Sequence, residues 1–585
     1  MSGICGYVGE ASPEILTAML GTIDYRGDRT DTVHAPGVGL GYRWWGGRPG
    51  KSSSILRQGP HLVACAGTLA PPAPSPVEAL FSRLSAGGSA LDDLDGAFAC
   101  AWWDGERRRL TLARDPFGVR SLYYAVQGGV LYFASELKQL LAVPGFEAAL
   151  DPAAIHKYLT FSFVPGESVP LRGVKRLLPG HLGVFEGGQL SSSTPYFTLR
   201  EQIDPALEDQ ATAVKRVRTL CRKAVERRLN GEPEVALYLS GGIDSSGVAV
   251  WLKEAGVKVQ AFSLDFGERS VEREQAEQVS RMLEIPLTWV KSSGEDVGKA
   301  LMELVWKLDL PFGDAVTGPQ FLLGRAARQA GLSAVFNGEG GDQLFGGWTS
   351  KPMVAAEVFG GLYEDSPEEP EELYLRSYHR FYGLEDALYT PEFRAQVGGP
   401  GQRRALLRPY LGSPENPHFL NRVRLADIAL KGSQNILPRA ERIANAWALD
   451  MRVPLFDREL ATASFALPPR LKLHGACEKY VLKLALQNKL PDEIVWRRKF
   501  GMSVPATDWV LGPLAPLMEE LLGPSAVKQR GMFREDYVSR LRQGQDQPDE
   551  TRRRRIGEKL WALAMLEAWM RVFVDGRGRR PGGGA

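Results

Sequence analysis

Residues 240–246 constrain the fold of this chain more than any other stretch. They read Ser-Gly-Gly-Ile-Asp-Ser-Ser, follow the apolar run 235–239 and precede the helix-like run 247–252. This order predicts a strand, a tight glycine turn and a helix N-terminus, where backbone N–H groups and hydroxyls can bind an anion. Asp244 would repel a bare phosphate but suits a Mg²⁺ ion that bridges phosphates. The ligand-binding residues predicted here are Ser240, Gly241, Gly242, Asp244, Ser245 and Ser246.

Strands and helices continue to alternate after this loop. Strands are predicted at 257–264, 288–290 and 334–336, and helices at 271–283, 297–308 and 319–330. This alternation predicts an α/β domain with a doubly wound parallel sheet, which binds ligands at the carboxyl ends of its strands. A second glycine-rich loop, 337–347, follows the last of these strands and carries the acids Glu339 and Asp342.

Length and composition limit the function. A chain of 585 residues exceeds one hydrophobic core, so at least two domains are expected. Lys and Arg number 71 against 69 Asp and Glu, which argues against a nucleic-acid partner. The N-terminus lacks a signal-peptide pattern and no apolar run is long enough for a membrane span. Five cysteines, without a paired spacing, indicate a reducing compartment, so a cytoplasmic protein is expected.

The loop at 240–246 resembles the pyrophosphate loop of ATP pyrophosphatases, which cleave ATP between the α and β phosphates. It is not a Walker A loop, because no Gly-Lys-Ser/Thr follows the turn. The resemblance implies ATP and Mg²⁺ as cofactors. It also implies an ATP-pyrophosphatase domain of the adenine nucleotide α-hydrolase-like type over 205–575, followed by a flexible tail over 576–585.

The first 204 residues resemble the glutaminase domain of class II glutamine amidotransferases, as found in asparagine synthetases. The matching segments are Gly-Ile-Cys-Gly-Tyr-Val-Gly at 3–9, Tyr-Arg-Gly-Asp at 25–28, Leu-Asp-Gly-Ala-Phe-Ala at 94–99, Ala-Arg-Asp-Pro-Phe-Gly-Val-Arg at 113–120 and Phe-Ala-Ser-Glu-Leu-Lys at 133–138. The resemblance implies an αββα sandwich of the N-terminal-nucleophile hydrolase type.

The chemistry of that domain is missing from this sequence. The family uses a cysteine made N-terminal by removal of Met1, with its own amine as the base. Position 2 is Ser2, and Cys5 lies inside the chain without a free amine. Where the family has Asn-Gly-Glu to hold glutamine, residues 66–68 read Ala-Gly-Thr. An inactive glutaminase domain is therefore predicted, with an engineered Cys→Ser change at position 2 left open.

The resemblance also assigns roles in the second domain. Asp342 matches the second Mg²⁺ ligand beside Asp244, and Glu339 matches the acid that takes the proton of the incoming amine. The strand end at Ser263 matches backbone contacts to adenine. The further matches are Gly338 in the second loop, Lys479 near the nucleotide and Lys499 at the α-phosphate and acyl intermediate. Glu441 and Asn445 stand where the family usually has Asp and Met.

The predicted activity is an ATP-dependent carbon–nitrogen ligase that adenylates a carboxylate and transfers it to an amine. Three hypotheses remain. The first is a glutamine-independent cyclase of the lasso-peptide or β-lactam synthetase type, acting on a small molecule or peptide that carries both groups, with precursor-peptide delivery proteins as candidate partners. The second is an asparagine synthetase that uses free ammonia, and the third is a catalytically silent scaffold. A homodimer is expected only because relatives are often dimers.

Overall fold

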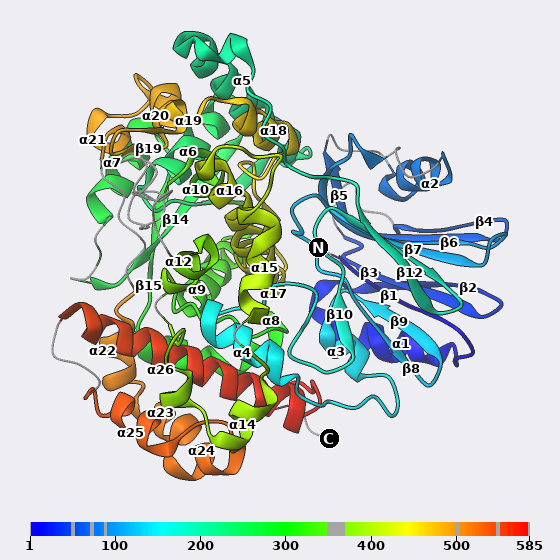
Figure 1. Ribbon diagram of the computed structural model, residues 1–585. Helices are drawn as coiled ribbons and strands as arrows, with labels where there is room; N and C mark the ends of the chain where they lie inside the picture. The colour runs from blue at the N-terminus through cyan, green and yellow to red at the C-terminus, as the bar shows by residue number, and fades with distance from the viewer. Residues whose placement is uncertain are drawn as a thin grey trace.

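The computed structural model describes residues 2–47, 53–70, 75–86, 91–267, 270, 272–347, 369–378, 380–399, 401–497, 504–545 and 550–582. It contains a two-sheet sandwich formed by the N-terminal third and a parallel sheet surrounded by helices (Figure 1). The fold class predicted from the sequence is confirmed. Among the described helices, none combines the length and the apolar character that a membrane crossing requires.

The sandwich consists of two six-stranded antiparallel sheets, with orders β10-β8-β9-β1-β3-β2 and β12-β11-β7-β6-β5-β4. Alternate residues of each strand face opposite sides: Ile4 lies in the core between the sheets, whereas Cys5 packs towards helices. Helices α1 and α3 cover one sheet and α2 the other, which gives the αββα order. The strands are β1 (Ser2–Val8), β2 (Arg29–Ala35), β3 (Val38–Trp44), β4 (Ile55–Gln58), β5 (His61–Ala70), β6 (Asp95–Asp104), β7 (Arg109–Arg114), β8 (Tyr123–Gln127), β9 (Val130–Ala134), β10 (Val174–Arg176), β11 (His181–Glu186) and β12 (Gln189–Pro195), and the helices are α1 (Glu14–Gly21), α2 (Pro76–Ala86), α3 (Leu137–Leu141) and α4 (Pro152–Phe161).

The second sheet is parallel, with the order β15-β14-β13-β16-β17. The chain starts at the central strand β13, moves outward through β14 and β15, and then returns to the other side through β16 and β17. Strand order therefore reverses between β13 and β16, and this is where open parallel sheets bind ligands. The elements are β13 (Glu234–Tyr238), β14 (Lys258–Asp265), β15 (Leu287–Lys291), β16 (Ala334–Phe336) and β17 (Asp450–Arg452), with helices α5 (Gln210–Leu229), α6 (Ile243–Glu254), α7 (Arg273–Leu283), α8 (Gly294–Leu308) and α9 (Thr317–Gln329).

The C-terminal residues return to the sandwich. Helix α26 (Glu550–Met570) and the following π-helix η6 (Arg571–Asp575) pack in the same hydrophobic core as β1, α1 and α8. Beyond them, Trp306 donates to the Gly578 carbonyl at 3.0 Å and Arg577 donates to the Phe146 carbonyl at 2.6 Å. The first residues of the segment predicted as a flexible tail, 576–578, are therefore hydrogen-bonded to the rest of the molecule.

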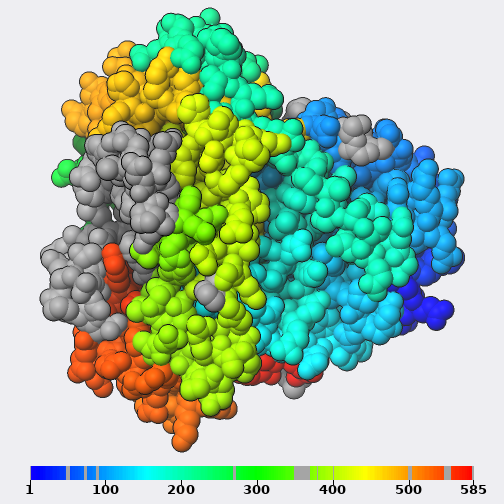
Figure 2. All heavy atoms as spheres, viewed as in Figure 1, coloured from blue at the N-terminus to red at the C-terminus, as the bar shows by residue number. Residues whose placement is uncertain are grey.

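A buried seam of ion pairs joins the sandwich to the second part of the chain. Arg26 pairs with Glu441 of α17 (Leu437–Ala446) at 2.8 Å, and Lys138 pairs with Asp309 at 3.1 Å. The side chains of Arg26 and Glu441 are 3% exposed, and those of Lys138 and Asp309 are fully buried. Figure 2 shows the same two parts in continuous contact on one face of the molecule. Removing one partner of such a pair would leave an uncompensated buried charge.

Candidate active site

The loop at 240–246 has the predicted strand–turn–helix form. Gly241 has φ +80°, and a Cβ there would lie 2.7 Å from the backbone nitrogen of Ala276, so this position needs glycine. The hydroxyls close the turn: the Ser240 amide donates to Ser245 Oγ at 3.2 Å, and the Gly242 amide donates to Ser240 Oγ at 3.2 Å. The side chains of Ser240 and Ser245 therefore stabilise the conformation of the loop that is predicted to bind phosphate.

Two other serines that were predicted to bind the ligand, Ser246 and Ser263, differ in their position relative to the central cavity. Ser246 is fully buried on the core side of α6 and is absent from the residues that line the central cavity. Ser263 lines that cavity, but its hydroxyl donates to the Leu239 carbonyl. Ser246 therefore does not line this cavity. The prediction for Ser263 concerned its backbone at the strand end, and the contact of its hydroxyl does not affect that prediction.

The second glycine loop lies directly against the first. A Cβ at Gly338 would be 2.5 Å from the Ser245 amide nitrogen, and one at Gly341 would be 2.0 Å from Asp244 Oδ1. The structure shows that these glycines let the two loops, which follow the neighbouring strands β13 and β16, approach each other.

Lys479 connects the two predicted metal-binding acids. Its Nζ lies 2.7 Å from Asp342 Oδ1 and also contacts Asp244 Oδ2. Lys479 is 2% exposed. Burial alone would lower the pKa of this lysine, but the two carboxylates raise it well above its ordinary value. Because both carboxylates converge on one cationic atom, the pair fits a bound Mg²⁺ ion.

These loops surround a cavity of about 270 Å³ at the carboxyl ends of β13, β14 and β16. Nine of the predicted residues line it together with Ser263: Ser240, Gly241, Gly242, Asp244, Ser245, Gly338, Glu339, Asp342 and Lys479. The amide of Glu339 donates to Asn337 Oδ1 at 3.3 Å, which fixes the backbone of the proposed base. Lys499 falls outside the described residues, so its predicted role stays a prediction.

Sequence reasoning missed several charged residues of this cavity. Lys483 lies 3.3 Å from Glu478, and Arg497 lies 3.6 Å from Glu272, so two ion pairs form part of the lining. Lys483 follows Lys479 by one helical turn, which was a usable signal. Glu272 lies far from Arg497 in the sequence, and only the folded sheet brings it to the cavity.

The N-terminal domain presents a closed site at its first strand. Ser2 is 3% exposed, and its Oγ accepts a hydrogen bond from the Gly67 amide at 3.1 Å. Cys5 is fully buried, and burial raises the pKa of its thiol far above the ordinary value, so it stays a protonated core residue. These positions agree with the prediction that Cys5 does not replace the missing nucleophile.

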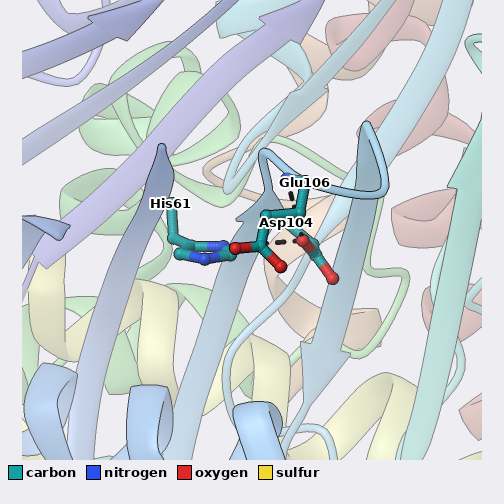
Figure 3. Close-up of side chains that lie close together, drawn as sticks. All are labelled: His61, Asp104 and Glu106. Carbon is teal, nitrogen blue, oxygen red and sulfur yellow. Dashed lines mark hydrogen bonds and ion pairs between the residues drawn. The ribbon is translucent and has the colours of Figure 1, made fainter. Parts of the chain in front are cut away.

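A separate cluster of ligand-type side chains lies at one end of the sandwich (Figure 3). His61 Nδ1 lies 3.5 Å from Asp104 Oδ1, and Glu106 completes the group. The Asp104 carboxylate already accepts hydrogen bonds from the Glu106 amide at 3.1 Å and from Arg107 Nη1 at 2.9 Å. The cluster therefore caps the turn between β6 and β7 and lies apart from the cavity at the carboxyl ends of β13, β14 and β16.

Two family models match the chain. Residues 216–571 match the asparagine synthase model, and residues 75–197 match a glutamine amidotransferase domain model. Among named relatives, asparagine synthetase [glutamine-hydrolyzing] 1 of Bacillus subtilis is 25% identical over 83% of this chain and 79% of its own length. A putative asparagine synthetase of Mycobacterium bovis is 27% identical over 84% of this chain and 78% of its own length. Amidase chry2 of Gibberella zeae is 30% identical over 76% of this chain and 75% of its own length.

The asparagine synthase match covers more than half of the chain and includes both glycine loops, Lys479 and the cavity between them. The predicted family and the predicted class of activity are thereby confirmed. The chain belongs to the asparagine synthase family of ATP-dependent carbon–nitrogen ligases.

Proposed function

We propose that this protein is a glutamine-independent amide ligase whose amine is already part of the substrate. The carboxylate of a small molecule or peptide attacks the α-phosphate of ATP, which forms an acyl-adenylate and releases pyrophosphate. An amine then displaces AMP and forms the amide. An intramolecular cyclase of the lasso-peptide or β-lactam synthetase type is the form that this proposal takes.

The buried Ser2 is the observation that carries the proposal. A glutaminase of this class needs a cysteine at position 2 with access to glutamine, whereas Ser2 is 3% exposed and bound to the Gly67 amide.

The residues of the second domain supply the activation chemistry in this proposal. The loop at 240–246 and Lys479 bind the phosphates, and Mg²⁺ held by Asp244 and Asp342 would neutralise the charge of the leaving pyrophosphate. Glu339 accepts the proton that the amine must lose before it becomes a nucleophile. Lys499 is proposed to stabilise the negative charge at the α-phosphate.

The alternative is an asparagine synthetase that uses free ammonia. It is favoured by Glu339 at the cavity and by the names of the relatives from Bacillus and Mycobacterium. In that case the carboxylate is aspartate and the first domain is only a structural support.

The test is pyrophosphate release from MgATP and aspartate, measured in parallel with ammonium chloride, with glutamine and with neither. No aspartate-dependent release is expected from the cyclase, and its own substrate must then be sought among peptides that carry a free amine and a side-chain carboxylate. Asparagine formed with ammonia alone would establish the alternative. Asparagine formed equally well with glutamine would refute glutamine independence.

A further inference from the structure

Lys479 occupies the position between the two acids that the proposed function assigns to a metal. Its Nζ contacts Asp244 Oδ2 and lies 2.7 Å from Asp342 Oδ1. The acids are about one-fifth exposed, at 21% and 22%, whereas the lysine side chain is 2% exposed. The ammonium is therefore more shielded from solvent than the two carboxylates, although all three residues line the cavity.

The surrounding backbone is shaped to place this ammonium. Lys479 has φ +54°, a left-handed conformation that is unfavourable for a side chain of its type, directly before helix α20 (Tyr480–Leu486). A Cβ at Gly347 would lie 2.6 Å from Lys479 Cε and 2.0 Å from Asp342 Oδ1. A Cβ at Gly341 would lie equally close to Asp244. The positions of Lys479, Asp244 and Asp342 therefore depend on two glycines and on the strained backbone of the lysine.

Electrostatics makes the lysine and a divalent ion compete for these acids. A lysine ammonium and a Mg²⁺ ion that share two carboxylates would stand within a few Å, where like charges repel strongly inside a protein. Magnesium also requires nearly octahedral oxygen ligands at about 2.0–2.1 Å, which leaves no place for an ammonium between the same oxygens.

We propose that Lys479 is an internal counterion that holds Asp244 and Asp342 together in the nucleotide-free enzyme and is displaced when the metal arrives with ATP. The phosphates of the nucleotide provide new acceptors for the displaced ammonium, so metal and nucleotide bind as one unit. This inference rests on the proposed nucleotide and metal site. It makes Lys479 a positioning residue, which holds the two acids in place and competes with the metal for them until the nucleotide binds.

The experiment measures Mn²⁺ binding to the full-length, nucleotide-free protein by the loss of the free Mn²⁺ signal in electron paramagnetic resonance. Lys479→Met should tighten Mn²⁺ binding by about tenfold or more, because it removes the competing charge and keeps the acids. Lys489→Met is the control: it removes the same charge from a lysine that pairs with Glu254 and does not line the cavity, so its loss should leave Mn²⁺ affinity unchanged.

A second variant separates competition from a folding effect. In Lys479→Ala, propylammonium chloride should weaken Mn²⁺ binding by refilling the position of the lost side chain, whereas sodium chloride at the same ionic strength should not. Unchanged Mn²⁺ affinity in Lys479→Met, or an equal increase in Lys489→Met, would overturn the proposal. Pyrophosphate release by the wild-type enzyme tests the proposed function independently, because it does not depend on binding order. If Lys479→Met does not fold, Lys479→Gln and the propylammonium titration decide the question.

Discussion

Arg26 in the sandwich and Glu441 in α17 form an ion pair of 2.8 Å in which both side chains are 3% exposed. Glu441 also pairs with Arg120 at 2.5 Å, and burial opposes its charge while the arginines lower its pKa. The sequence presented Glu441 as a departure from the family's usual Asp. In the structure it is a central contact between the two parts of the chain.

Glu441→Ala should lower the stability of the whole protein by about 3 kcal/mol, because two buried arginines each lose a carboxylate partner, while Arg26 keeps Glu136 and Arg120 keeps Asp450. The measurement is urea or thermal denaturation followed by circular dichroism. Arg216→Ala provides the control: its pair with Glu459 has side chains that are 50% and 43% exposed, so a change of at most about 1 kcal/mol is expected. Equal small effects in the two variants would show that the seam contributes no stability.

Asp342→Asn should abolish MgATP-dependent pyrophosphate release, with a loss of about 100-fold or more, because one of two converging carboxylates no longer binds the metal. The assay is continuous detection of pyrophosphate with the full-length enzyme and its identified substrate. Asp386→Asn, whose side chain is 92% exposed, should retain wild-type rates. Wild-type release by Asp342→Asn would remove this residue from the metal site.

Glu339→Gln should form the acyl-adenylate but convert it slowly to the amide, because the amide side chain cannot accept the proton of the amine. Single-turnover measurements of pyrophosphate and of product separate the two steps, and a lag between them of about tenfold or more is expected. Equal slowing of both steps would mean that Glu339 contributes to nucleotide binding instead.

Ser2→Cys should not create glutaminase activity. The residue is buried, its Oγ binds the Gly67 amide, and residues 66–68 lack the side chains with which the family holds glutamine. Glutamate release from glutamine is the measurement, with pyrophosphate release as the check that the variant is folded. Glutamine hydrolysis in the variant would show that only the nucleophile had been lost.

His156 should make stability depend on acidic pH. It is 2% exposed, its Nδ1 lies 2.8 Å from the Tyr389 hydroxyl, and burial followed by nearby Arg403 lowers its pKa to about 3. In the unfolded chain the pKa of His156 is about 6.5. Between about pH 6.5 and pH 3 the unfolded chain therefore binds a proton at His156 that the folded chain does not bind. Stability should therefore fall by up to about 1.4 kcal/mol per pH unit as pH drops from about 6 towards 3.

The comparison of wild type with His156→Gln isolates this contribution from the other titrating groups. Denaturation midpoints measured across the acidic range should converge as pH falls, because the variant lacks the protonation penalty. Parallel midpoint curves for the two proteins would mean that His156 carries its proton in the folded state.

The elements of the second domain were predictable because the pattern is local. The strands predicted at 235–239 and 334–336 are β13 and β16, and each carries its glycine loop at the carboxyl end. The strand order was not predictable, because nothing local in the sequence says that β16 returns to the other side of β13. That order alone places Asp244 and Asp342 beside each other.

The site was predictable by residue type but not by contact. Asp244 and Lys479 are separated by 235 positions, and no pattern in the sequence indicates that this lysine pairs with the acids instead of with ATP. Ser246 is a second example: its place in the motif predicts a ligand contact, whereas the period of α6 places its side chain in the core. Side-chain direction depends on packing, which the motif does not contain.

The return of the C-terminal residues to the sandwich has a consequence for biosynthesis. The core that contains Cys5 and Tyr7 is completed by α26 and η6, and Gly578 binds Trp306. The residues of α26 and η6 are synthesised long after those of β1, so this shared core must remain incomplete until they have emerged from the ribosome. The apolar face of the nascent sandwich is exposed during this interval, which makes it a surface on which a chaperone can act.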